Sequence, residues 1–447
     1  MPNAPLDTIA AIATPPGNGG VGIIRISGPG VQHIAGRLLS QALAPRTAVF
    51  TRFLDEAGST LDSGIALYFP GPHSYTGEDV LELQAHGGAV LLNMLLRAAL
   101  KQGARLANPG EFTLRAFLNN KLDLAQAEAV ADLINAGTEQ SARSAQQSLQ
   151  GRFSTLVHEL VDELIKLRTF VEAAIDFVDE EIDFLSTGNI KTSLEQLLTK
   201  LAQILATANQ GRLLRDGMTV VLAGQPNVGK SSLLNALAGH DAAIVTDIAG
   251  TTRDVLKERV QLDGMPLHVI DTAGLRETDN AIEQEGIRRA QQEIKKADAI
   301  LLLIDSSQNE AAALESFLPE GVKLTRIHNK IDLTDRPPGI IETGLQTEIY
   351  LSVKTGQGME LLKQHLKQCM GFASTAADVF TARTRHLEAL GKALEFTENA
   401  LANLNLNQAE LVAEDLRQAQ NSLSEITGEF TSDDLLGAIF SSFCIGK

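Results

Sequence analysis

The chain contains no tryptophan and only two cysteines among its 447 residues, and aromatic side chains make up 4% of it. Two cysteines that lie far apart, Cys369 and Cys444, are neither a disulfide framework nor a zinc-ligand set. Because aromatic rings are the usual stacking platforms for nucleic-acid bases, their scarcity argues against extended single-strand binding. The chemistry of the chain must therefore come from its glycine, lysine and carboxylate motifs.

Long apolar runs are also missing. A membrane-spanning helix needs roughly 18 uncharged apolar residues, and the best candidate, "AVLLNMLLRAAL", is interrupted by an arginine. The first residues, "MPNAPLDTIAAIATPPGNGG", lack the basic segment and the apolar core of a signal peptide. We therefore expect a cytoplasmic protein that does not enter a membrane.

Positive charge is in short supply. Lysine and arginine number 38 against 55 aspartates and glutamates, which gives a formal net charge of −17. A protein that holds nucleic acid by itself usually presents a net basic surface. If RNA is a substrate, a local patch or a partner protein must supply much of the positive field.

The hydrophobic pattern changes along the chain and divides it into segments. Short β-branched runs and one helix predict an α+β domain at 1–118, and long amphipathic helices follow at 119–212. Alternating apolar strands and helices predict a parallel α/β domain at 213–375, and the helical pattern resumes at 376–447. The expected fold is a multidomain α/β architecture, with the α/β domain inserted into an all-α helical domain whose two halves pack together.

One glycine motif near the start is a decoy. Gly17, Gly19 and Gly22 match the dinucleotide-binding pattern G-x-G-x-x-G. That pattern binds a dinucleotide only when a helix follows it, because the helix amino terminus receives the pyrophosphate. Here the β-branched run "IIRIS" follows, so we expect a tight turn between two strands and no dinucleotide site.

A second glycine motif has the right context for a phosphate site. The stretch "VVLAGQPNVGKSSLLNAL" is a buried strand, a G-x-x-x-x-G-K-S loop and an apolar helix. Backbone N–H groups of such a loop converge on phosphate oxygens. Lys230 is expected to reach the β- and γ-phosphates and act in catalysis, and Ser231 to ligate magnesium. The predicted phosphate residues are Gly224, Asn227, Val228, Gly229, Lys230, Ser231 and Ser232.

Further motifs at strand ends indicate GTP. A carboxylate at Asp332 can accept hydrogen bonds from guanine N1–H and the 2-amino group, and adenine has neither donor there, so GTP is preferred to ATP. The γ-phosphate sensor is assigned to "DTAG", which is Asp271, Thr272, Ala273 and Gly274. The base-binding residues are assigned as Asn329, Lys330 and Asp332, together with Ser352, Val353 and Lys354.

The segment between the first two motifs predicts a switch loop. Asp263-Gly264 is a strong hairpin turn, so the runs on either side should pair antiparallel. Thr251 and Thr252 precede this hairpin, and we assign Thr252 to the magnesium shell. An ordinary surface loop is the alternative.

The position after Gly274 leaves open how water is activated. Ras-like GTPases use glutamine there to orient the attacking water, and Leu275 cannot do so. Glu283 is a candidate substitute, while Glu277 and Glu285 compete with it and a solvated helix face is the plain alternative for all three. Asn227 can offer an amide oxygen to a monovalent cation that neutralises charge developing between the phosphates.

Several stretches match a pattern narrower than the motifs shared by all GTPases. They are "TIAAIATPPGNGGVGIIRISGP", "SYTGEDVLELQAHGG", "NPGEFTLRAFLNNKLDLAQAEA", "IVTDIAGTTRD", "DTAGLRE" and the terminal "FCIGK". Over essentially its whole length the chain resembles the MnmE (TrmE) family of tRNA-modification GTPases. The resemblance implies a Ras-like P-loop GTPase domain inserted into the helical domain, preceded by a folate-binding α+β domain through which a homodimer forms.

The resemblance also implies an activity and its partners. GTP hydrolysis would be stimulated by K⁺ when two GTPase domains pair, with Mg²⁺ at the phosphates. A flavin-dependent partner of the MnmG (GidA) type would form a heterotetramer with the chain. The complex would modify the wobble uridine of certain tRNAs at carbon 5, in a carboxymethylaminomethyl or aminomethyl form. The one-carbon donor would be a reduced folate, either 5-formyl- or 5,10-methylenetetrahydrofolate.

Site residues follow from the resemblance by motif. It implies that K⁺ is held by Asn227, Thr246, Ile248 and Thr251, and Mg²⁺ by Ser231 and Thr252, with Glu283 positioning the water. It assigns the folate contacts to Arg25, Glu82, Lys121 and Lys447. Without the resemblance, Arg25, Glu82 and Lys121 would be interpreted as surface charges. Asn18 departs from the arginine that many members carry in this turn.

The last residues, "CIGK", place Cys444 where a prenylation signal carries its cysteine. Gly446 and Lys447 do not fit that signal, and the segment upstream is acidic and apolar, so a lipid anchor is not expected. An apolar helix before Cys444 would dock the tail and deliver the thiol to the folate site, either for one-carbon transfer or only as packing.

A ribosome-assembly switch that binds RNA in its GTP form is the competing function. It predicts a basic appended RNA-binding domain, and this sequence has an acidic helical domain in that place.

Overall fold

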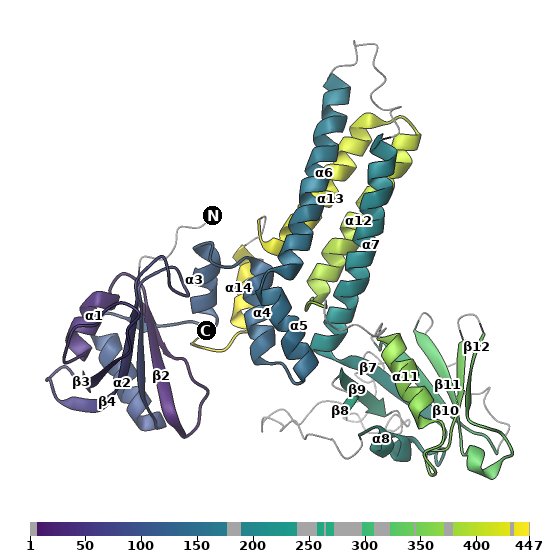
Figure 1. Cartoon of the computed structure of the whole chain (residues 1–447), viewed down its shortest axis with the longest axis horizontal. Coiled ribbons are helices and arrows are strands. Elements are labelled where there is room, and N and C mark those ends of the chain that lie inside the picture. Colours follow the sequence, from purple (N-terminus) through teal and green to yellow (C-terminus); the bar gives the residue numbers. More distant parts are fainter. Residues whose placement is uncertain are drawn as a thin grey trace, which may run out of the picture. The chain divides into compact units, whose positions relative to one another are not determined.

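The computed structural model describes residues 7–176, 189–238, 257–262, 265–271, 297–307, 322–343, 346–370, 379–429 and 433–446. The chain divides into two compact units, whose helices and strands are labelled in Figure 1. The first comprises Met1–Ala131, Leu149–Ser193 and Glu395–Lys447, and the second comprises Asp132–Ser148 and Leu194–Leu394. No helix within the described ranges is both long enough and apolar enough to cross a membrane.

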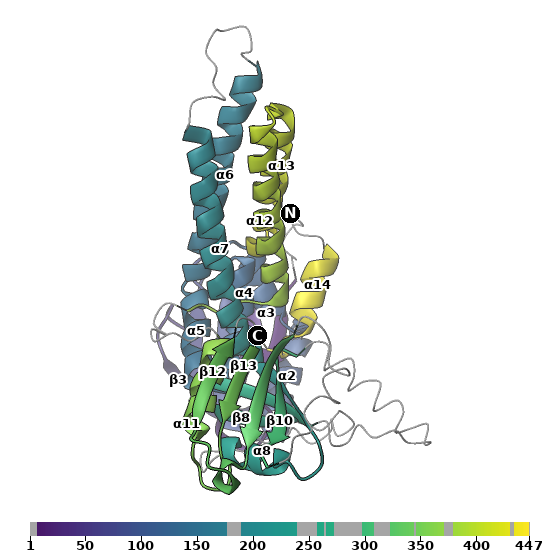
Figure 2. The same cartoon turned by 90° about the vertical axis from the view of Figure 1, so that its right-hand side faces the viewer.

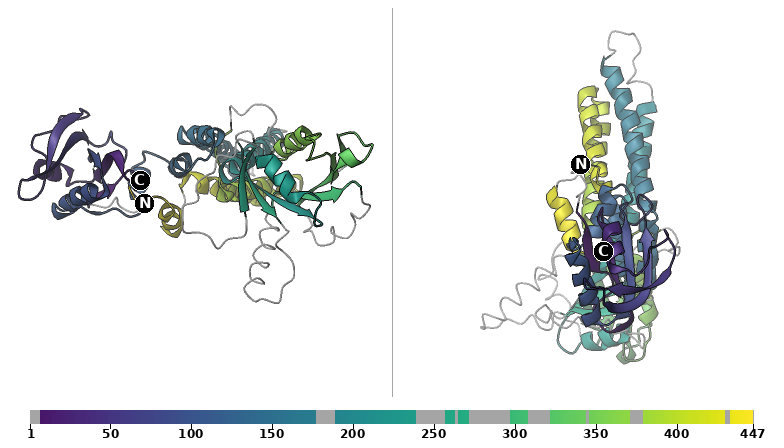
Figure 3. Two further views of the ribbon diagram at one scale, coloured as in Figure 1. Left: turned by 90° about the horizontal axis from the view of Figure 1, so that it is seen from below. Right: turned by 90° about the vertical axis from the view of Figure 1, so that its left-hand side faces the viewer.

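The first unit contains a six-stranded sheet in the order β3-β4-β5-β2-β1-β6. Helices α1 (Val31–Leu38) and α2 (Ala89–Lys101) cover one face of it (Figure 3). Leucines and isoleucines of the sheet and the two helices form the core between them. Alternation of buried and exposed residues along the strands reflects this one-sided covering. The strands are β1 (Ile9–Ile12), β2 (Gly19–Ser27), β3 (Val49–Leu54), β4 (Thr60–Phe69), β5 (Val80–Gly87) and β6 (Arg105–Leu106).

The glycine-rich segment near the start connects two strands, as the sequence predicts. β1 pairs antiparallel with β2, and β2 begins at Gly19 inside the decoy motif. An added Cβ at Gly22 would lie 2.4 Å from Leu92 Cδ1, so this glycine is required for the close approach of α2 to the sheet. The motif serves strand packing here and has no following helix.

Helices complete the first unit. The amphipathic helices α6 (Arg152–Asp176) and α13 (Ala409–Thr427) run side by side, as Figures 1 and 2 show. Helix α14 (Asp433–Ser441) packs its apolar face on α3 (Glu111–Leu118) and α4 (Leu124–Ile134) through Leu436, Phe440 and Leu124. The end of the chain is therefore fixed to segments that follow the first sheet directly in sequence.

The second unit contains a seven-stranded sheet in the order β12-β13-β11-β10-β7-β9-β8. The five central strands are parallel, and β8 and β12, labelled at opposite sides of the sheet in Figure 1, pair antiparallel at its two edges. Nearly continuous apolar runs such as "AILLLID" are typical of strands buried on both faces. The strands are β7 (Met218–Gly224), β8 (Lys257–Leu262), β9 (Met265–Asp271), β10 (Ala299–Asp305), β11 (Lys323–Asn329), β12 (Gly339–Thr343) and β13 (Gln346–Tyr350).

Two predictions about this sheet can be compared with it. The parallel order of its central strands confirms the predicted α/β domain. The pairing of Leu262 with Met265 confirms the hairpin expected across Asp263-Gly264. Strand β12 was not anticipated, because "GIIET" carries no strong turn or alternation signal. The four segment boundaries derived from the sequence remain predictions.

The remaining helices lie in the second unit or at its boundary with the first. They are α5 (Glu139–Leu149), α7 (Asn189–Asp216), α8 (Lys230–Ala238), the short 3₁₀ helix η2 (Ile331–Leu333), α11 (Met359–Cys369) and α12 (Thr384–Asn405). Helices α8 and α11 contribute Leu233, Leu237, Leu362 and Leu366 to a core shared with the sheet.

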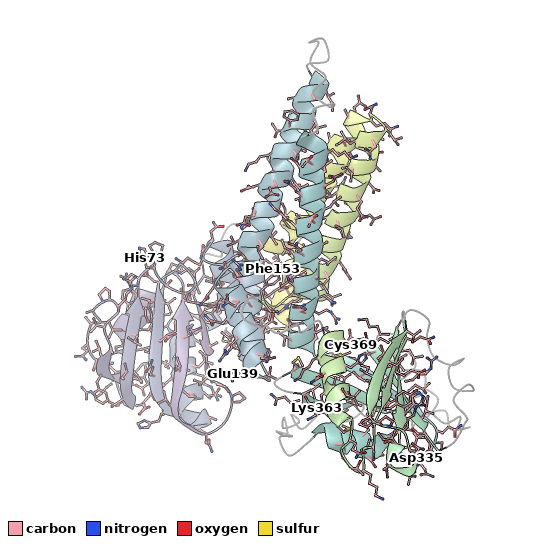
Figure 4. All side chains as sticks on the ribbon, turned by 45° about the vertical axis from the view of Figure 1, so that its right-hand side comes forward. His73, Glu139, Phe153, Asp335, Lys363 and Cys369 are labelled. Carbon is pink, nitrogen blue, oxygen red and sulfur yellow. The ribbon has the colours of Figure 1, made fainter. Side chains whose placement is uncertain are left out.

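Cys369, which lies on α11 (Figure 4), is half-buried, and burial raises the pKa of its thiol. A protonated, packed thiol is the unreactive form of cysteine.

Candidate nucleotide and ligand sites

The phosphate loop joins the end of β7 to the start of α8. Gly224, Asn227 and Gly229 all adopt positive φ angles, +150°, +66° and +104°. A Cβ at Gly224 would lie 2.6 Å from the Leu303 carbonyl oxygen, and one at Gly229 would lie 2.5 Å from Asn329 Nδ2. The two glycines are therefore required by both conformation and close approach. Such a loop directs backbone N–H groups into one concave site, where an anion can bind.

Lys230 lies within this loop. Its ammonium donates to the Gly224 carbonyl at 2.7 Å and to the Gln225 carbonyl at 3.0 Å, and the residue is buried. Ser231, the next residue, is exposed at the amino terminus of α8. A helix amino terminus attracts anions, and a serine hydroxyl is an oxygen ligand of the kind that Mg²⁺ takes. The residues present thus fit a magnesium nucleotide.

A cavity of about 550 Å³ opens beside the phosphate loop. It brings together residues from the phosphate loop, the end of β11 and the segment after β13. Most of its lining was predicted from motifs: Asn227, Gly229, Ser232, Asn329, Lys330, Asp332, Ser352, Val353 and Lys354. Asn235, Ala236 and Leu333 also line it and were missed, because they stand outside the recognised motifs.

Asn329 ties the walls of this cavity together. Its Nδ2 donates to the Val228 carbonyl at 2.8 Å, and its Oδ1 accepts from the N–H groups of Lys330 at 2.8 Å and Val353 at 3.1 Å. Because the residue is buried, these hydrogen bonds are shielded from water. One side chain thereby fixes the phosphate loop and both base-binding segments in one arrangement.

Asp332 and Ser352 form the part of the cavity assigned to the base. The fully buried Ser352 donates its hydroxyl to Asp332 Oδ1 at 2.6 Å. This hydrogen bond orients the carboxylate while its other oxygen keeps acceptor capacity. A fixed carboxylate at the mouth of a purine-sized cavity can accept from two adjacent N–H donors of guanine.

Several predicted residues lie outside the part of the chain that the structure describes. They are the switch residues Thr246, Ile248, Thr251 and Thr252, the sensor residues Thr272, Ala273 and Gly274, the candidate catalytic Glu283, and Lys447. Asp271 ends β9, whose backbone is described. Across the described residues, no group of three His, Cys, Asp or Glu side chains could hold a metal ion.

A second cluster lies in the first unit, on the sheet face opposite α1 and α2. Arg25 on β2 and Glu82 on β5 are direct partners in the strand register, and their side chains form an ion pair at 2.9 Å. The Arg25 guanidinium also lies over the rings of Tyr75 and Phe112, with distances of 5.5 and 5.8 Å to the ring centroids. Two predicted folate residues are thus in contact, and the two aromatic neighbours were missed.

Lys121 lies close to the loop that carries Tyr75. An added Cβ at Gly77 would be 3.4 Å from Lys121 Cγ, so the lysine stem packs on this glycine. The same loop is fixed by Asn119, whose side chain donates to the Thr76 carbonyl at 2.7 Å. The sequence motifs "SYTGED" and "NNKLDL" meet here.

The carboxy-terminal tail docks against the same sheet. Gly446 has φ +97°, and an added Cβ there would lie 2.4 Å from the Ile12 carbonyl oxygen. Arg25 Nη1 donates to the Gly446 carbonyl at 3.5 Å, and the Gly110 N–H donates to the Cys444 carbonyl at 3.3 Å. The Cys444 residue itself is exposed. The tail therefore reaches Arg25, as expected of a tail held by an apolar helix.

Comparison with known proteins decides the family. The model of the MnmE helical domain matches residues 124–444, and that of the GTP-binding protein TrmE N-terminus matches residues 8–121. The chain belongs to the MnmE family of tRNA modification GTPases. It is therefore a GTP hydrolase that acts in tRNA modification and uses GTP with Mg²⁺. Its fold is multidomain α/β, with a Ras-like P-loop GTPase domain, a helical domain and an amino-terminal TrmE domain.

Individual relatives match along the whole chain. The tRNA modification GTPase MnmE of Hydrogenovibrio crunogenus is 59% identical over 446 residues, 99% of each chain. That of Vibrio cholerae serotype O1 is 56% identical over 450 residues, again 99% of each chain. Among solved structures, the G domain of the T. maritima FeoB iron transporter aligns at 27% identity with a TM-score of 0.26, covering 34% of this chain and 98% of that one.

Proposed function

We propose that GTP binds in the cavity beside the phosphate loop, with its guanine against Asp332 and its phosphates against Lys230. The observation that carries this proposal is the set of hydrogen bonds that Asn329 donates and accepts, which joins the phosphate loop to the base-binding segments. The purine and the phosphates of one nucleotide would then bind to segments that Asn329 holds together. Asp271, Thr272, Ala273 and Gly274 would sense the γ-phosphate.

Hydrolysis would depend on K⁺ as well as Mg²⁺. We assign the K⁺ ligands to Asn227, Thr246, Ile248 and Thr251, and the Mg²⁺ ligands to Ser231 and Thr252. Asn227 supports this assignment because its positive φ places it at the bend of the phosphate loop. A bound K⁺ would supply positive charge next to the phosphate bridge where other GTPases insert an arginine. Glu283 would orient the attacking water, since Leu275 cannot.

A reduced folate would bind at the cluster around Arg25 in the first unit. A pterin ring presents the same adjacent N–H donors as guanine, and Glu82 is a carboxylate that could accept them. Arg25, which is paired with Glu82 at 2.9 Å, would contact the pterin end, while Lys121 and Lys447 would offer positive charge to the carboxylates of the folate glutamate. The Arg25–Glu82 pair, flanked by Tyr75 and Phe112, supports a site with both an apolar wall and paired charges.

The reaction would install a carboxymethylaminomethyl or aminomethyl group at carbon 5 of the wobble uridine. The chain would act as a homodimer joined through its amino-terminal domains, in a heterotetramer with a flavin-dependent partner of the MnmG (GidA) type. A net charge of −17 supports a partner that carries most of the tRNA affinity. The ribosome-assembly alternative would need a basic appended domain, and the two family models cover residues 8–121 and 124–444 without one. A cytoplasmic location remains a prediction.

Cys444 would take part in one-carbon transfer as a nucleophile or a proton carrier. Its exposed position on a tail that touches Arg25 supports this role. The test is Cys444→Ser with Cys369→Ser as the matched control, each expressed in a strain that lacks the wild-type chain. Wobble nucleosides are quantified by mass spectrometry, and GTP hydrolysis is measured on the purified variants.

We expect Cys444→Ser to lose modification and keep hydrolysis, while Cys369→Ser keeps both. If Cys444→Ser keeps both activities, its thiol only packs and the proposed transfer role fails.

A further inference from the structure

Asp305 is a buried carboxylate at the end of β10, directly beside the predicted base-binding motif. It pairs in register with Asn329 on the neighbouring parallel strand β11. The side chain is only 9% exposed. Burying a charge is unfavourable unless partners compensate it, so a carboxylate in this place calls for an explanation.

Both oxygens of the Asp305 carboxylate have partners. Oδ1 accepts from the Ser307 N–H at 3.0 Å and from the Ser307 hydroxyl at 2.6 Å. Oδ2 accepts from the Lys330 ammonium at 2.7 Å. Burial alone would raise the pKa of Asp305, but the hydrogen bonds and charge from Lys330 and Ser307 hold it below its ordinary value. The carboxylate is thus ionised and held in one orientation at neutral pH.

Lys330 has an unusual backbone conformation. Its φ of +66° and ψ of +35° lie in the left-handed region, which costs a residue with a side chain about 1 kcal/mol or more. This kink turns the chain from β11 into η2 and brings Asp332 to the cavity. Two contacts hold it: the Lys330 N–H donates to Asn329, and the Lys330 ammonium donates to Asp305. The lysine stem between these anchors lines the cavity.

We propose that Asp305 is a positioning residue for guanine-nucleotide binding, which holds the Lys330 side chain across the base cavity and stabilises the kink that presents Asp332. This inference rests on the proposed base pocket and adds a residue that belongs to none of its motifs. Asp305 acts through Lys330 and does not touch the phosphates. It therefore affects GTP and GDP equally and leaves the chemical step unchanged once nucleotide is bound.

The decisive variant is Asp305→Asn in the full-length chain. Asparagine keeps the size and can still accept from Ser307, but it loses the charge that holds Lys330. We expect the Kd for both GTP and GDP, measured by fluorescent-nucleotide titration, to rise about tenfold, the size of one hydrogen bond to a charged group. KM for GTP should rise similarly while kcat stays within about twofold.

Two further variants distinguish a positioning role of Asp305 from a general loss of protein stability. Ser307→Ala removes a hydrogen bond from Asp305 but keeps the ion pair, so its Kd should change less than about threefold. Lys330→Met removes the partner of Asp305, and adding Asp305→Asn to it should then change the Kd by less than about twofold. Thermal unfolding without nucleotide, recorded for every variant, shows how far each one is destabilised.

Specific results would overturn the inference. They are a tenfold loss that persists in the Lys330→Met background, a loss confined to kcat, or an unchanged Kd in Asp305→Asn. Failure of the base pocket itself is distinguishable, because Asp332→Asn would then bind GTP as tightly as the wild type does. If Asp332→Asn weakens GTP binding and Asp305→Asn does not, the pocket stands and only the role of Asp305 is wrong.

Discussion

The two sheets of this molecule assemble their candidate sites in different ways. In the second unit, parallel strands β7, β10 and β11 end at one edge, and the loops that follow Gly224, Asp305 and Asn329 meet there. In the first unit, Arg25 and Glu82 lie side by side on one face of the sheet, on the antiparallel strands β2 and β5. The carboxy-terminal tail contacts Arg25 there. One site is built from strand ends and the other from a sheet face.

This difference determines what each site is made of. Strand ends of a parallel sheet expose backbone N–H groups and short loops, which suit phosphates and a flat base. A sheet face offers side chains only, so its specificity depends on pairs such as Arg25–Glu82 and on neighbouring rings. The two sites should therefore respond to separate mutations.

The largest expected effect is the loss of folate binding in Arg25→Ala. This arginine touches Glu82, two aromatic rings and the tail carbonyl, so its removal takes away the centre of the site. Calorimetry with 5-formyltetrahydrofolate should give no measurable heat of binding, while GTP turnover stays at the wild-type rate. Arg52→Ala, on β3 of the same sheet, is the control and should keep folate binding. A loss of GTP turnover in Arg25→Ala would break the separation of the two sites.

The next effect is on the base cavity. Asp332→Asn should weaken GTP binding by about 2–3 kcal/mol, because it replaces a charged acceptor that Ser352 holds in place. Fluorescent-nucleotide titration measures this loss. The same substitution should weaken the binding of inosine triphosphate less, because its base lacks the 2-amino group. Asp335→Asn, in the loop after η2 (Figure 4), is the control. Unchanged guanine selectivity in Asp332→Asn would show that the base binds elsewhere.

The contrast between the sites also explains what could be predicted from sequence. The phosphate-binding and base-binding motifs can be recognised in the sequence because each is a run of a few residues at the end of a strand. The order of the strands in the sheet then brings these runs together. The sequence did not identify Asp305, because the role proposed for it depends on the register of β10 with β11, and no local sequence pattern predicts that register. Tyr75 and Phe112 were missed for the same reason, since they meet Arg25 only after the sheet forms.

The roles of some glycines also depend on contacts between residues that are distant in the sequence, which local patterns do not predict. The sequence shows a glycine at position 446, but the reason for it, the close approach of its backbone to the Ile12 carbonyl, involves a residue hundreds of positions away in the chain. The resemblance to the MnmE family predicted a folate site at Arg25, whereas the sequence pattern alone would have assigned a surface charge to this residue. The fold class needed no such help, because strand and helix periodicity is local.

A smaller effect concerns the cation dependence of hydrolysis. GTP turnover in KCl should exceed that in NaCl of equal ionic strength by about tenfold, which corresponds to about 1.4 kcal/mol of transition-state stabilisation. Asn227→Gly keeps the positive φ at no steric cost but removes the amide oxygen, so it should reduce the difference between the two salts. Equal wild-type rates in the two salts would contradict the proposed K⁺ site and leave only Mg²⁺ at the phosphates.

The smallest effect concerns the charge cluster around Glu111 in the first unit. Glu111 is buried beside Arg105 and the fully buried Arg115. Burial would raise its pKa, but hydrogen bonds from Arg105, from the Asn108 N–H and from Arg115 hold the pKa below the ordinary value. A depressed folded-state pKa contributes stability above the unfolded pKa, about 4.3 for glutamate, and that stability is lost as the pH falls through the folded pKa.

Glu111→Gln should therefore unfold at a lower temperature than the wild type at pH 7. The gap should remain constant down to about pH 4.3 and then narrow, because the carboxylate becomes protonated first in the unfolded chain and only at lower pH in the folded one. Thermal unfolding followed by circular dichroism from pH 7 to pH 3 measures the gap, with the exposed Glu398→Gln in the same unit as the control. A gap that stays constant to pH 3 would mean that size and packing at this position matter to the first unit, and that the ion pairs of Glu111 do not.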